Sequence, residues 1–219
     1  PKLAAAERGV RHLMSTELLT IKDLQALKIK ISFPVGDYLV GSVEDLDVSM
    51  VNISKDLVRE VDRLIEHNND LSIVGLCVRN IFELFLIFIH IKSDENALRD
   101  WIGQSHKDIT DIQDGLISLL QRSNIESPDL NSSKEDFLKS AAAQGVKPKH
   151  NFNIKALANK YGYQEDYDAI YKLCSKVVHP SSLKINAYDA MNIENRFQSA
   201  LIHVGAYFSA LFIERKTNA

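Results

Sequence analysis

The sequence contains few residues that break helices and few that form cross-links. Its 219 residues include only 9 glycines and 5 prolines, too few for a β-sandwich with its many tight turns. The two cysteines, Cys77 and Cys174, stand in separate apolar stretches and not in a paired Cys-x-x-Cys arrangement. Isolated cysteines of this kind are typical of reduced, buried thiols in a cytoplasmic protein, and not of a disulfide framework.

An excess of basic residues is also missing. The chain has 26 Lys and Arg against 29 Asp and Glu, a net charge of −3. Proteins that bind duplex nucleic acid usually carry an excess of basic residues, because these residues displace the counterions of the phosphates. The overall charge therefore does not favour duplex nucleic acid as a partner. It is still compatible with local basic patches on the surface.

Known motifs for metals and phosphates are absent from the sequence. The 7 histidines do not form His-x-x-x-His or His-Glu-x-x-His, and no glycine-rich phosphate loop or dinucleotide fingerprint occurs. These spacings are what zinc sites and nucleotide-binding loops require. We therefore predict no metal site and no bound cofactor.

One long apolar run, residues 71–91, is long enough to cross a membrane. It carries Arg79, Asn80 and Glu83 near its middle, and a charge at that depth costs roughly 2.5–3.5 kcal/mol on insertion scales. The first residues of the sequence also lack an apolar stretch of signal-peptide length. We therefore expect a cytoplasmic protein without a membrane partner, in which this run is a buried central helix.

Helical periodicity is the strongest pattern in the sequence. Between residues 47 and 67, for example, Ile53, Leu57, Val61 and Leu64 recur at intervals of three and four, which makes one apolar stripe on a helix. Residues 123–133 are rich in Asn and Ser and predict a loop, and residues 29–43 predict a loop or a short hairpin. Helices are predicted at about 3–14, 20–28, 47–67, 71–92, 93–101, 105–122, 133–145, 153–161, 165–178 and 189–215.

These elements predict an all-α protein, a single-domain helical bundle with a central apolar helix at 71–92 and a long C-terminal helix. Residues 1–45 would form an N-terminal helical or loop extension, and residues 46–219 the bundle domain. We also expect a homodimer formed through an exposed apolar strip on the C-terminal helix.

Polar residues inside apolar helices are the main candidates for function. Arg79 and Glu83 are four residues apart, so they lie on one face of the central helix and can pair. Burying such a pair rarely stabilises a fold, because desolvation offsets the Coulomb attraction. The pair therefore suggests a specific task, which is either to line a pocket or to fix the register of the bundle. The alternative is a structural salt bridge at the centre of the bundle whose two groups satisfy each other.

A second set of candidates, Tyr171, Ser175 and His179, is spaced four residues apart on another predicted helix. A hydroxyl and an imidazole one turn apart can form the hydrogen-bonded pair that base-assisted chemistry needs. The alternative is structural. An imidazolium favours a helix C-terminus, and Pro180 stops the helix at this point.

The segment 167–182, with its core Tyr-x-x-Leu-Cys-Ser-x-x-Val-His-Pro-Ser, resembles a family of bacterial helical proteins of unknown function. That family pairs such a motif with an upstream helix that bears Arg and Glu, as residues 78–83 do here. The resemblance covers about residues 50–210, and these two patches are its distinctive parts.

More distantly, the chain is similar to the HEPN superfamily of helical bundles, which includes toxins, abortive-infection proteins and other RNA-targeting factors. Active HEPN ribonucleases carry an Arg, a polar residue and then a His four to six residues after the Arg. Here Arg79 and Asn80 begin such a motif, but no His follows at that spacing, and the window before His179 contains no Arg. The resemblance therefore implies a HEPN-like protein without an intact ribonuclease motif.

Three functional hypotheses follow from these residues. The first is a HEPN-like protein of a bacterial defence or stress system that binds RNA or a nucleotide, with Arg and His holding a phosphate. The second is a non-enzymatic interaction or scaffold module whose buried polar cluster is structural. The third is a metal-free hydrolase that uses the Ser–His pair. The candidate ligand-binding residues are Arg79, Glu83, Tyr171, Ser175 and His179.

Overall fold

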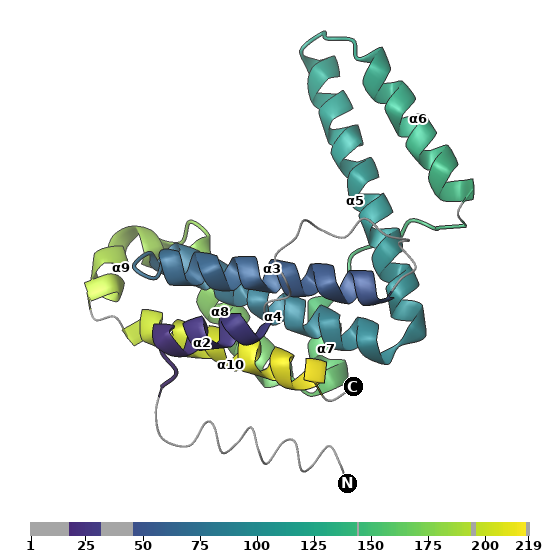
Figure 1. Cartoon of the computed structure of the whole chain (residues 1–219). Helices are drawn as coiled ribbons and strands as arrows, with labels where there is room; N and C mark the ends of the chain where they lie inside the picture. Colours follow the sequence, from purple (N-terminus) through teal and green to yellow (C-terminus); the bar gives the residue numbers. More distant parts are fainter. Residues whose placement is uncertain (1–17, 32–45, 144, 194–195, 218–219) are drawn as a thin grey trace. The chain divides into compact units, whose positions relative to one another are not determined.

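The computed structural model describes residues 18–31, 46–143, 145–193 and 196–217 (Figure 1). Within these ranges every regular element is an α-helix and no strand occurs, which confirms the all-α prediction. The helices are α2 (Ile21–Ile31), α3 (Leu46–Glu66), α4 (Leu71–Ser93), α5 (Glu95–Arg122), α6 (Pro128–Ala143), α7 (Ile154–Tyr161), α8 (Gln164–Val178), α9 (Ser182–Ile193) and α10 (Arg196–Thr217).

The contacts within the chain divide it into two compact units. The first comprises the described parts of Pro1–Val40, Met50–Ile89 and Ile154–Ala219, and the second those of Gly41–Ser49 and His90–Asn153. The candidate residues found in the sequence all belong to the first unit.

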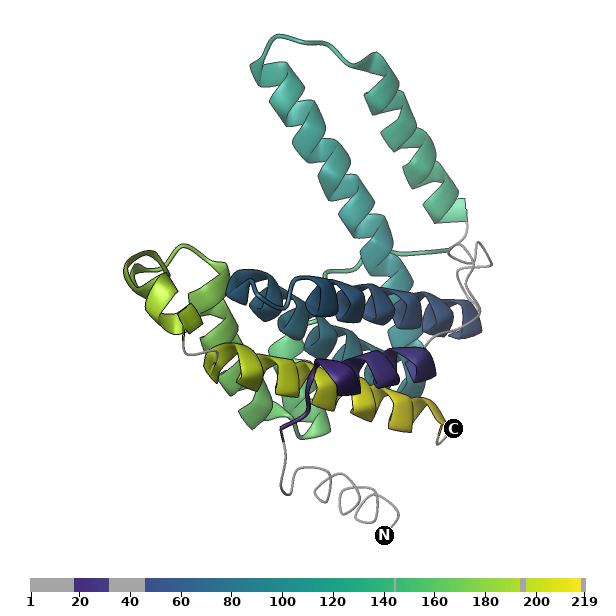
Figure 2. The ribbon, with the colours of Figure 1, turned by 60° about the vertical axis from the view of Figure 1, so that its left-hand side comes forward.

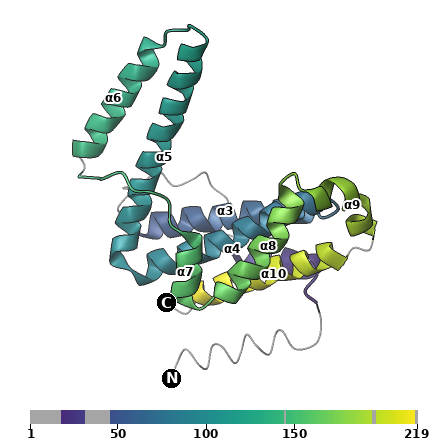
Figure 3. The ribbon, with the colours of Figure 1, turned by 180° about the vertical axis from the view of Figure 1, so that it is seen from behind.

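Helix α4 is the core of the first unit, as the sequence predicts. It lies between α3 on one side and α8 on the other, which the front and back views show (Figures 1 and 3). Its aromatic side chains pack against α10, with ring centroids 4.8 Å apart for Phe82 and Phe208 and 4.1 Å apart for Phe88 and Phe212. Aromatic contacts of this kind, one edge-to-face and one tilted, add to the burial of apolar area that stabilises the unit.

Among the described helices, α4 is the one whose length and composition would allow it to cross a membrane. In the fold, 56% of its apolar window is buried against the rest of the chain. A helix that is apolar nearly all round must be covered by neighbours. The core position of α4 therefore accounts for its apolar composition.

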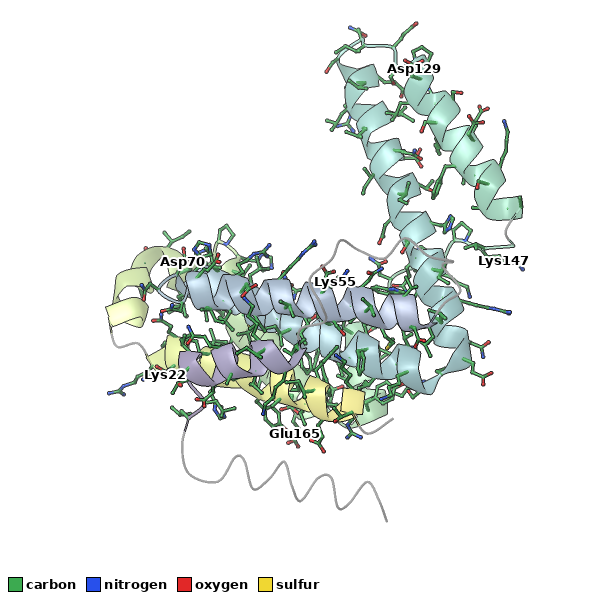
Figure 4. The ribbon with its side chains drawn as sticks, in the orientation of Figure 1. Lys22, Lys55, Asp70, Asp129, Lys147 and Glu165 are labelled. Atoms are coloured by element: carbon green, nitrogen blue, oxygen red, sulfur yellow. The ribbon has the colours of Figure 1, made fainter. Side chains whose placement is uncertain are left out.

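The start of α4 follows α3 after a short turn. The carboxylate of Asp70 accepts hydrogen bonds from the backbone N–H groups of Ser72 (2.8 Å) and Ile73 (3.2 Å), and Figure 4 labels Asp70 at this junction. An Asp in this position satisfies N–H groups that have no partner within the helix. Asp70 is therefore the N-cap of α4.

Helix α2 lies along α10 (Figure 2). Lys28 of α2 forms an ion pair with Asp62 of α3, and the N–H of Leu19 donates to Nδ1 of His203 in α10 at 2.9 Å. The predicted helix at 20–28 is confirmed and extends to Ile31. Most of the predicted 29–43 loop, the predicted helix at 3–14 and the predicted domain boundary after residue 45 lie outside the described residues.

The second unit contains a hairpin of two helices, α5 and α6 (Figure 2). The ring of His106 in α5 stacks on Phe137 in α6, with centroids 4.9 Å apart. Lys134 of α6 forms an ion pair with Asp114 of α5. These contacts hold the two helices side by side.

The segment that follows the hairpin is bonded to the first turns of α5. The N–H of Lys149 donates to the carbonyl of Gly103 at 3.0 Å, and the N–H of Phe152 donates to Oε1 of Gln104 at 3.2 Å. Gly103 is required here, because a Cβ at this position would clash with the carbonyl oxygen of Lys147. Residues 147–152 are therefore an ordered connector without regular secondary structure.

The hairpin differs from the prediction at both of its helices. Helix α5 is one continuous helix capped by Asp94, whose side chain accepts from the N–H of Asn96, and not two segments at 93–101 and 105–122. Helix α6 begins at Pro128 and not at residue 133. A proline fits the first turn of a helix, where its missing N–H leaves no hydrogen bond unmade, so most of the predicted loop at 123–133 is helical.

The C-terminal part also differs from the prediction of one helix at 189–215. The described residues contain α9, which begins at Ser182, and a separate α10, which begins at Arg196. The long C-terminal helix itself is confirmed. Its large apolar side chains are mostly buried inside the first unit, and the exposed exception is Phe197, at 43%.

Candidate functional site

The candidate site begins with an ion pair on one face of α4. The Nε of Arg79 donates to Oε1 of Glu83 at 2.8 Å, one helical turn away. The side chains are 32% and 25% exposed, so the pair lies at the edge of the core and is not buried as the apolar sequence around it suggested. An ion pair that keeps contact with water has a smaller desolvation cost than a buried one.

Tyr171 of α8 completes this cluster. Its hydroxyl donates to the same carboxylate oxygen, Oε1 of Glu83, and its ring centroid lies 4.6 Å from Cζ of Arg79, as in a cation–π contact. The ring of Tyr167 stacks on that of Tyr171, with centroids 4.1 Å apart and an angle of 30°. We call Arg79, Glu83 and Tyr171 the Arg79 cluster.

The packing of α8 on α4 places Tyr171 next to Glu83. Helix α8 buries Ile170, Cys174 and Val177 on one face. At Gly75 of α4 a Cβ would come within 2.5 Å of Cγ2 of Val177, so the absence of a side chain lets the two helices approach closely. Gly75, near the start of α4, contacts Val177, near the end of α8, whereas Glu83 further along α4 contacts the earlier Tyr171. The two helices therefore run in opposite directions.

The charges of the cluster favour a protonated tyrosine. Burial raises the pKa of Tyr171, and its hydrogen bond to Glu83 and the charge of Glu83 raise it further, while Arg79 opposes the shift. Burial lowers the pKa of Arg79, but Glu83 and Tyr171 outweigh that effect and the net shift is upward. Tyr171 therefore acts as a hydrogen-bond donor, and Arg79 as a permanent cation.

Cys174 lies beneath this cluster and is fully buried. Burial raises the pKa of its thiol to about 12, and the charge of Arg79 opposes that shift only in part. A nucleophilic cysteine needs a thiolate, which requires a lowered pKa. Cys174 is therefore a packing residue and not a nucleophile.

Ser175 and His179 do not join the Arg79 cluster through any hydrogen bond in the described ranges. The hydroxyl of Ser175 donates to the carbonyl of Lys172 at 3.1 Å, within its own helix. His179 is exposed and follows the last residue of α8, with φ −86° and ψ 152°. It lies two turns beyond Tyr171, about 12 Å along the helix. The structure thus brings together three of the five candidate residues.

The segment after His179 connects α8 to α9 by hydrogen bonds. The hydroxyl of Ser181 donates to the carbonyl of Lys176 at 2.9 Å and accepts from the N–H of Lys184 at 3.1 Å. The Nζ of Lys184 donates to the carbonyl of Val178 at 3.2 Å. In the described structure the His-Pro-Ser part of the motif therefore ends one helix and caps the next.

Tyr167 was not among the candidate residues, although it stacks on the cluster. Its spacing of four from Tyr171 already placed both rings on one helical face, and this was the signal that could have found it. Among the described residues, no group of three or more His, Cys, Asp or Glu side chains is placed to hold a metal ion. The arrangement offers a fixed cation beside stacked tyrosine rings, and no nucleophile paired with a base.

The cluster lies within a segment that matches a known family. Residues 50–197 match the model of a family described as "Family of unknown function (DUF5677)". This match includes both α4 and α8, which carry the Arg79 cluster. No curated protein and no solved structure matches the chain. The family match extends over more than half of the sequence, and the chain therefore belongs to this family of unknown function, DUF5677.

Proposed function

We propose that the chain is a HEPN-like helical protein that binds RNA or a nucleotide at the Arg79 cluster, in a bacterial defence or stress system, and does not cleave it. The observation that supports this proposal is the partly exposed guanidinium of Arg79, held against the ring of Tyr171 by Glu83. Arginine is well suited to phosphate, since its planar group donates several hydrogen bonds in a fixed geometry.

The stacked tyrosines support a ligand that contains bases as well as phosphate. Proteins that bind single-stranded RNA commonly stack unpaired bases on aromatic rings and on Arg guanidinium groups. Tyr167 and Tyr171 are both only half-buried, and Arg79 lies over one of the two rings. The net charge of the chain, −3, favours a single short ligand over a long duplex.

Two observations favour binding without cleavage. The sequence has no His at the HEPN spacing after Arg79. In the structure, Ser175 bonds to its own helix and His179 lies exposed at the helix end. A base-assisted reaction needs a nucleophile and a base within hydrogen-bond distance of each other, and the described part of the site does not provide that pair.

The test is direct binding. We expect the purified chain to bind a fluorescently labelled single-stranded RNA or a labelled adenine nucleotide in a polarisation assay. Arg79→Gln should weaken that binding at least about tenfold, as expected for loss of one charged contact to phosphate. Arg59→Gln is the control, because Arg59 also forms an ion pair within its own helix, with Asp56 of α3, but at a more exposed position outside the Arg79 cluster.

The outcome of this test separates the proposal from its alternative. Both variants should keep the helical circular dichroism of the parent chain. Equal binding by the parent chain and Arg79→Gln, or no binding by the parent chain, would contradict the proposal. A complementary test looks for co-purified nucleotide by the absorbance ratio and by mass spectrometry.

The second candidate function is a non-enzymatic interaction module in which the Arg79 cluster is structural. One observation favours it. Arg79 and Tyr171 both donate to the same oxygen of Glu83, so the polar groups satisfy one another and join α4 to α8 without a ligand. In this case Arg79→Gln and Tyr171→Phe would lower the stability of the fold and change no ligand affinity.

A further inference from the structure

Helix α5 carries a row of exposed apolar side chains in its second half. Ile109, Ile112, Leu116 and Leu119 are 41%, 63%, 46% and 61% exposed. Their spacing of three, four and three residues is that of the first and fourth positions of a heptad, which form the seam of a coiled coil. We call these four residues the α5 row.

Helix α6 does not cover the α5 row. It packs instead on a neighbouring face of α5, where His106 stacks on Phe137 and Asp114 pairs with Lys134. Packing of α6 on that face leaves the α5 row exposed. Large side chains left in water in a regular row mark an interaction site, whereas single exposed apolar residues do not.

We propose that the α5 row binds the α5 row of a second copy of this chain, with the two helices antiparallel. The charges beside the row support this arrangement. Asp108 and Arg122 flank the row along the edge away from α6, two heptads apart. When two such helices pair in opposite directions, Asp108 of each copy faces Arg122 of the other. The pairing therefore creates two symmetric ion pairs.

Asp108 and Arg122 are available for this role. Within the described residues neither forms an ion pair with another side chain. A parallel arrangement would instead bring Asp108 next to Gln113 of the second copy and leave Arg122 without an acid. The charge pattern thus selects the antiparallel direction.

Gly115 lies midway between Asp108 and Arg122 on the same edge. A Cβ at this position would meet no atom within 4 Å, so no contact inside the chain requires a glycine there. Glycine is unfavourable in the interior of a helix. In the antiparallel pair, Gly115 of one copy meets Gly115 of the other at the two-fold axis, and the missing side chains let the helices approach closely.

The surface involved sets the expected strength. The α5 row extends over about 15 Å of helix, which is small compared with the interfaces of permanent dimers. We therefore expect self-association in the micromolar range. This surface differs from the C-terminal helix on which the sequence placed a dimer, since most large apolar side chains of α10 are buried inside the first unit.

The first test measures the mass of the full chain by sedimentation velocity from low to high micromolar concentration. We expect a dimer that forms with increasing concentration and is lost in the double variant Ile112→Asp, Leu116→Asp. Ile29→Asp, at a position that is 77% exposed on α2, is the matched control and should leave the dimer unchanged. A parent chain that is monomeric throughout, or a dimer unaffected by the double variant, would overturn the proposal.

A charge exchange tests the direction of the helices. Asp108→Arg alone and Arg122→Asp alone each place like charges opposite one another, and should weaken the dimer at least about tenfold. The double variant Asp108→Arg, Arg122→Asp restores opposite charges and should recover the parent affinity. Failure of the double variant to recover the affinity would exclude the antiparallel pairing.

A cysteine at the axis provides a covalent readout. Gly115→Cys should form an intermolecular disulfide on mild oxidation, because the two positions face each other in the dimer. Gln121→Cys, exposed on the side of α5 that faces away from the α5 row, should form much less. The natural thiols, Cys77 and Cys174, are both buried and do not compete. Equal cross-linking at both positions would contradict the pairing.

Discussion

The hydroxyl of Tyr171 donates to the same carboxylate oxygen of Glu83 that accepts from Nε of Arg79, although the tyrosine is 88 positions further along the chain. One carboxylate oxygen thus joins α4 and α8, two helices that are distant in the sequence and pack against each other. Arg79 and Tyr171 each donate one hydrogen bond to Glu83. Substitutions that remove one donor at a time therefore measure what each bond contributes to the free energy of unfolding.

The hydroxyl of Tyr171 provides the first prediction. Tyr171→Phe keeps the ring over Arg79 and removes one hydrogen bond to a charged acceptor, which should lower the free energy of unfolding by about 1–2 kcal/mol. Urea denaturation followed by circular dichroism measures this change. Combined with Glu83→Gln in a double-mutant cycle, it should show a coupling of at least about 0.5 kcal/mol. Additive effects would mean that the bond does not contribute.

The close approach of α4 and α8 provides the second prediction. Gly75→Ala introduces a Cβ that would lie 2.5 Å from Cγ2 of Val177. Overpacking of this kind typically costs about 1–3 kcal/mol, more than the roughly 1 kcal/mol that alanine gains over glycine in a helix. We therefore expect a net loss of stability by urea denaturation. Val177→Ala in the same chain should restore part of it, and a loss that the second change leaves untouched would argue against this contact.

The buried thiols provide a prediction on pH. Burial, the largest cause in each case, raises the pKa of Cys77 and of Cys174 to about 12, from an ordinary value of 9.0. The folded state therefore holds these protons more tightly than the unfolded state. The stability that this contributes is fully present below pH 9 and is lost as the pH rises from 9 to 12.

Two measurements check this prediction. The native chain should react slowly with a thiol reagent at pH 8, and quickly once unfolded in denaturant. In denaturation curves between pH 8 and 11, Cys174→Ala should reduce the fall in stability with rising pH relative to the parent chain. Rapid reaction of both thiols in the native state would contradict the burial of these side chains.

The turn between α8 and α9 provides the fourth prediction. Ser181→Ala removes a helix cap and a hydrogen bond to the last turn of α8, which should cost about 1 kcal/mol, with a range of about 0.5–2. Ser182→Ala is the matched control, because the hydroxyl of Ser182 makes only a long contact of 3.4 Å with Asn186. Thermal unfolding measures both. Similar losses in the two variants would show that Ser181 is not the cap.

His179→Ala gives a contrasting expectation at the same turn. His179 is exposed and has no hydrogen bond or ion pair in the described part of the chain. Surface substitutions of this kind usually change stability by less than about 0.5 kcal/mol. A loss of stability well above that value would indicate a structural partner for the imidazole.

The sequence predicted the long periodic helices well, and irregular boundaries poorly. The apolar stripe of α3 and the apolar run of α4 were found within a residue or so of their ends, because burial imposes a period that sequence reading detects. Pro128 was placed in a loop, although it opens α6. A proline is compatible with both, and only the surrounding contacts decide between them.

The candidate site was predicted in part for a similar reason. The pairing of Arg79 with Glu83 follows from helix geometry alone, since the two lie one turn apart. The contact of Glu83 with Tyr171 depends on the direction and register of α8 against α4, which local spacing does not determine. The same spacing suggested a bond between Ser175 and His179, yet Ser175 donates to the carbonyl of Lys172, because local backbone acceptors compete for a serine hydroxyl.

The hydrogen bonds of Ser181 and Lys184 reach back to the carbonyls of Lys176 and Val178. The last turn of α8 and the first turn of α9 therefore share their terminal hydrogen bonds, and neither end can fray without exposing the other. In amide hydrogen exchange, the two turns would open as one cooperative segment with a common protection factor.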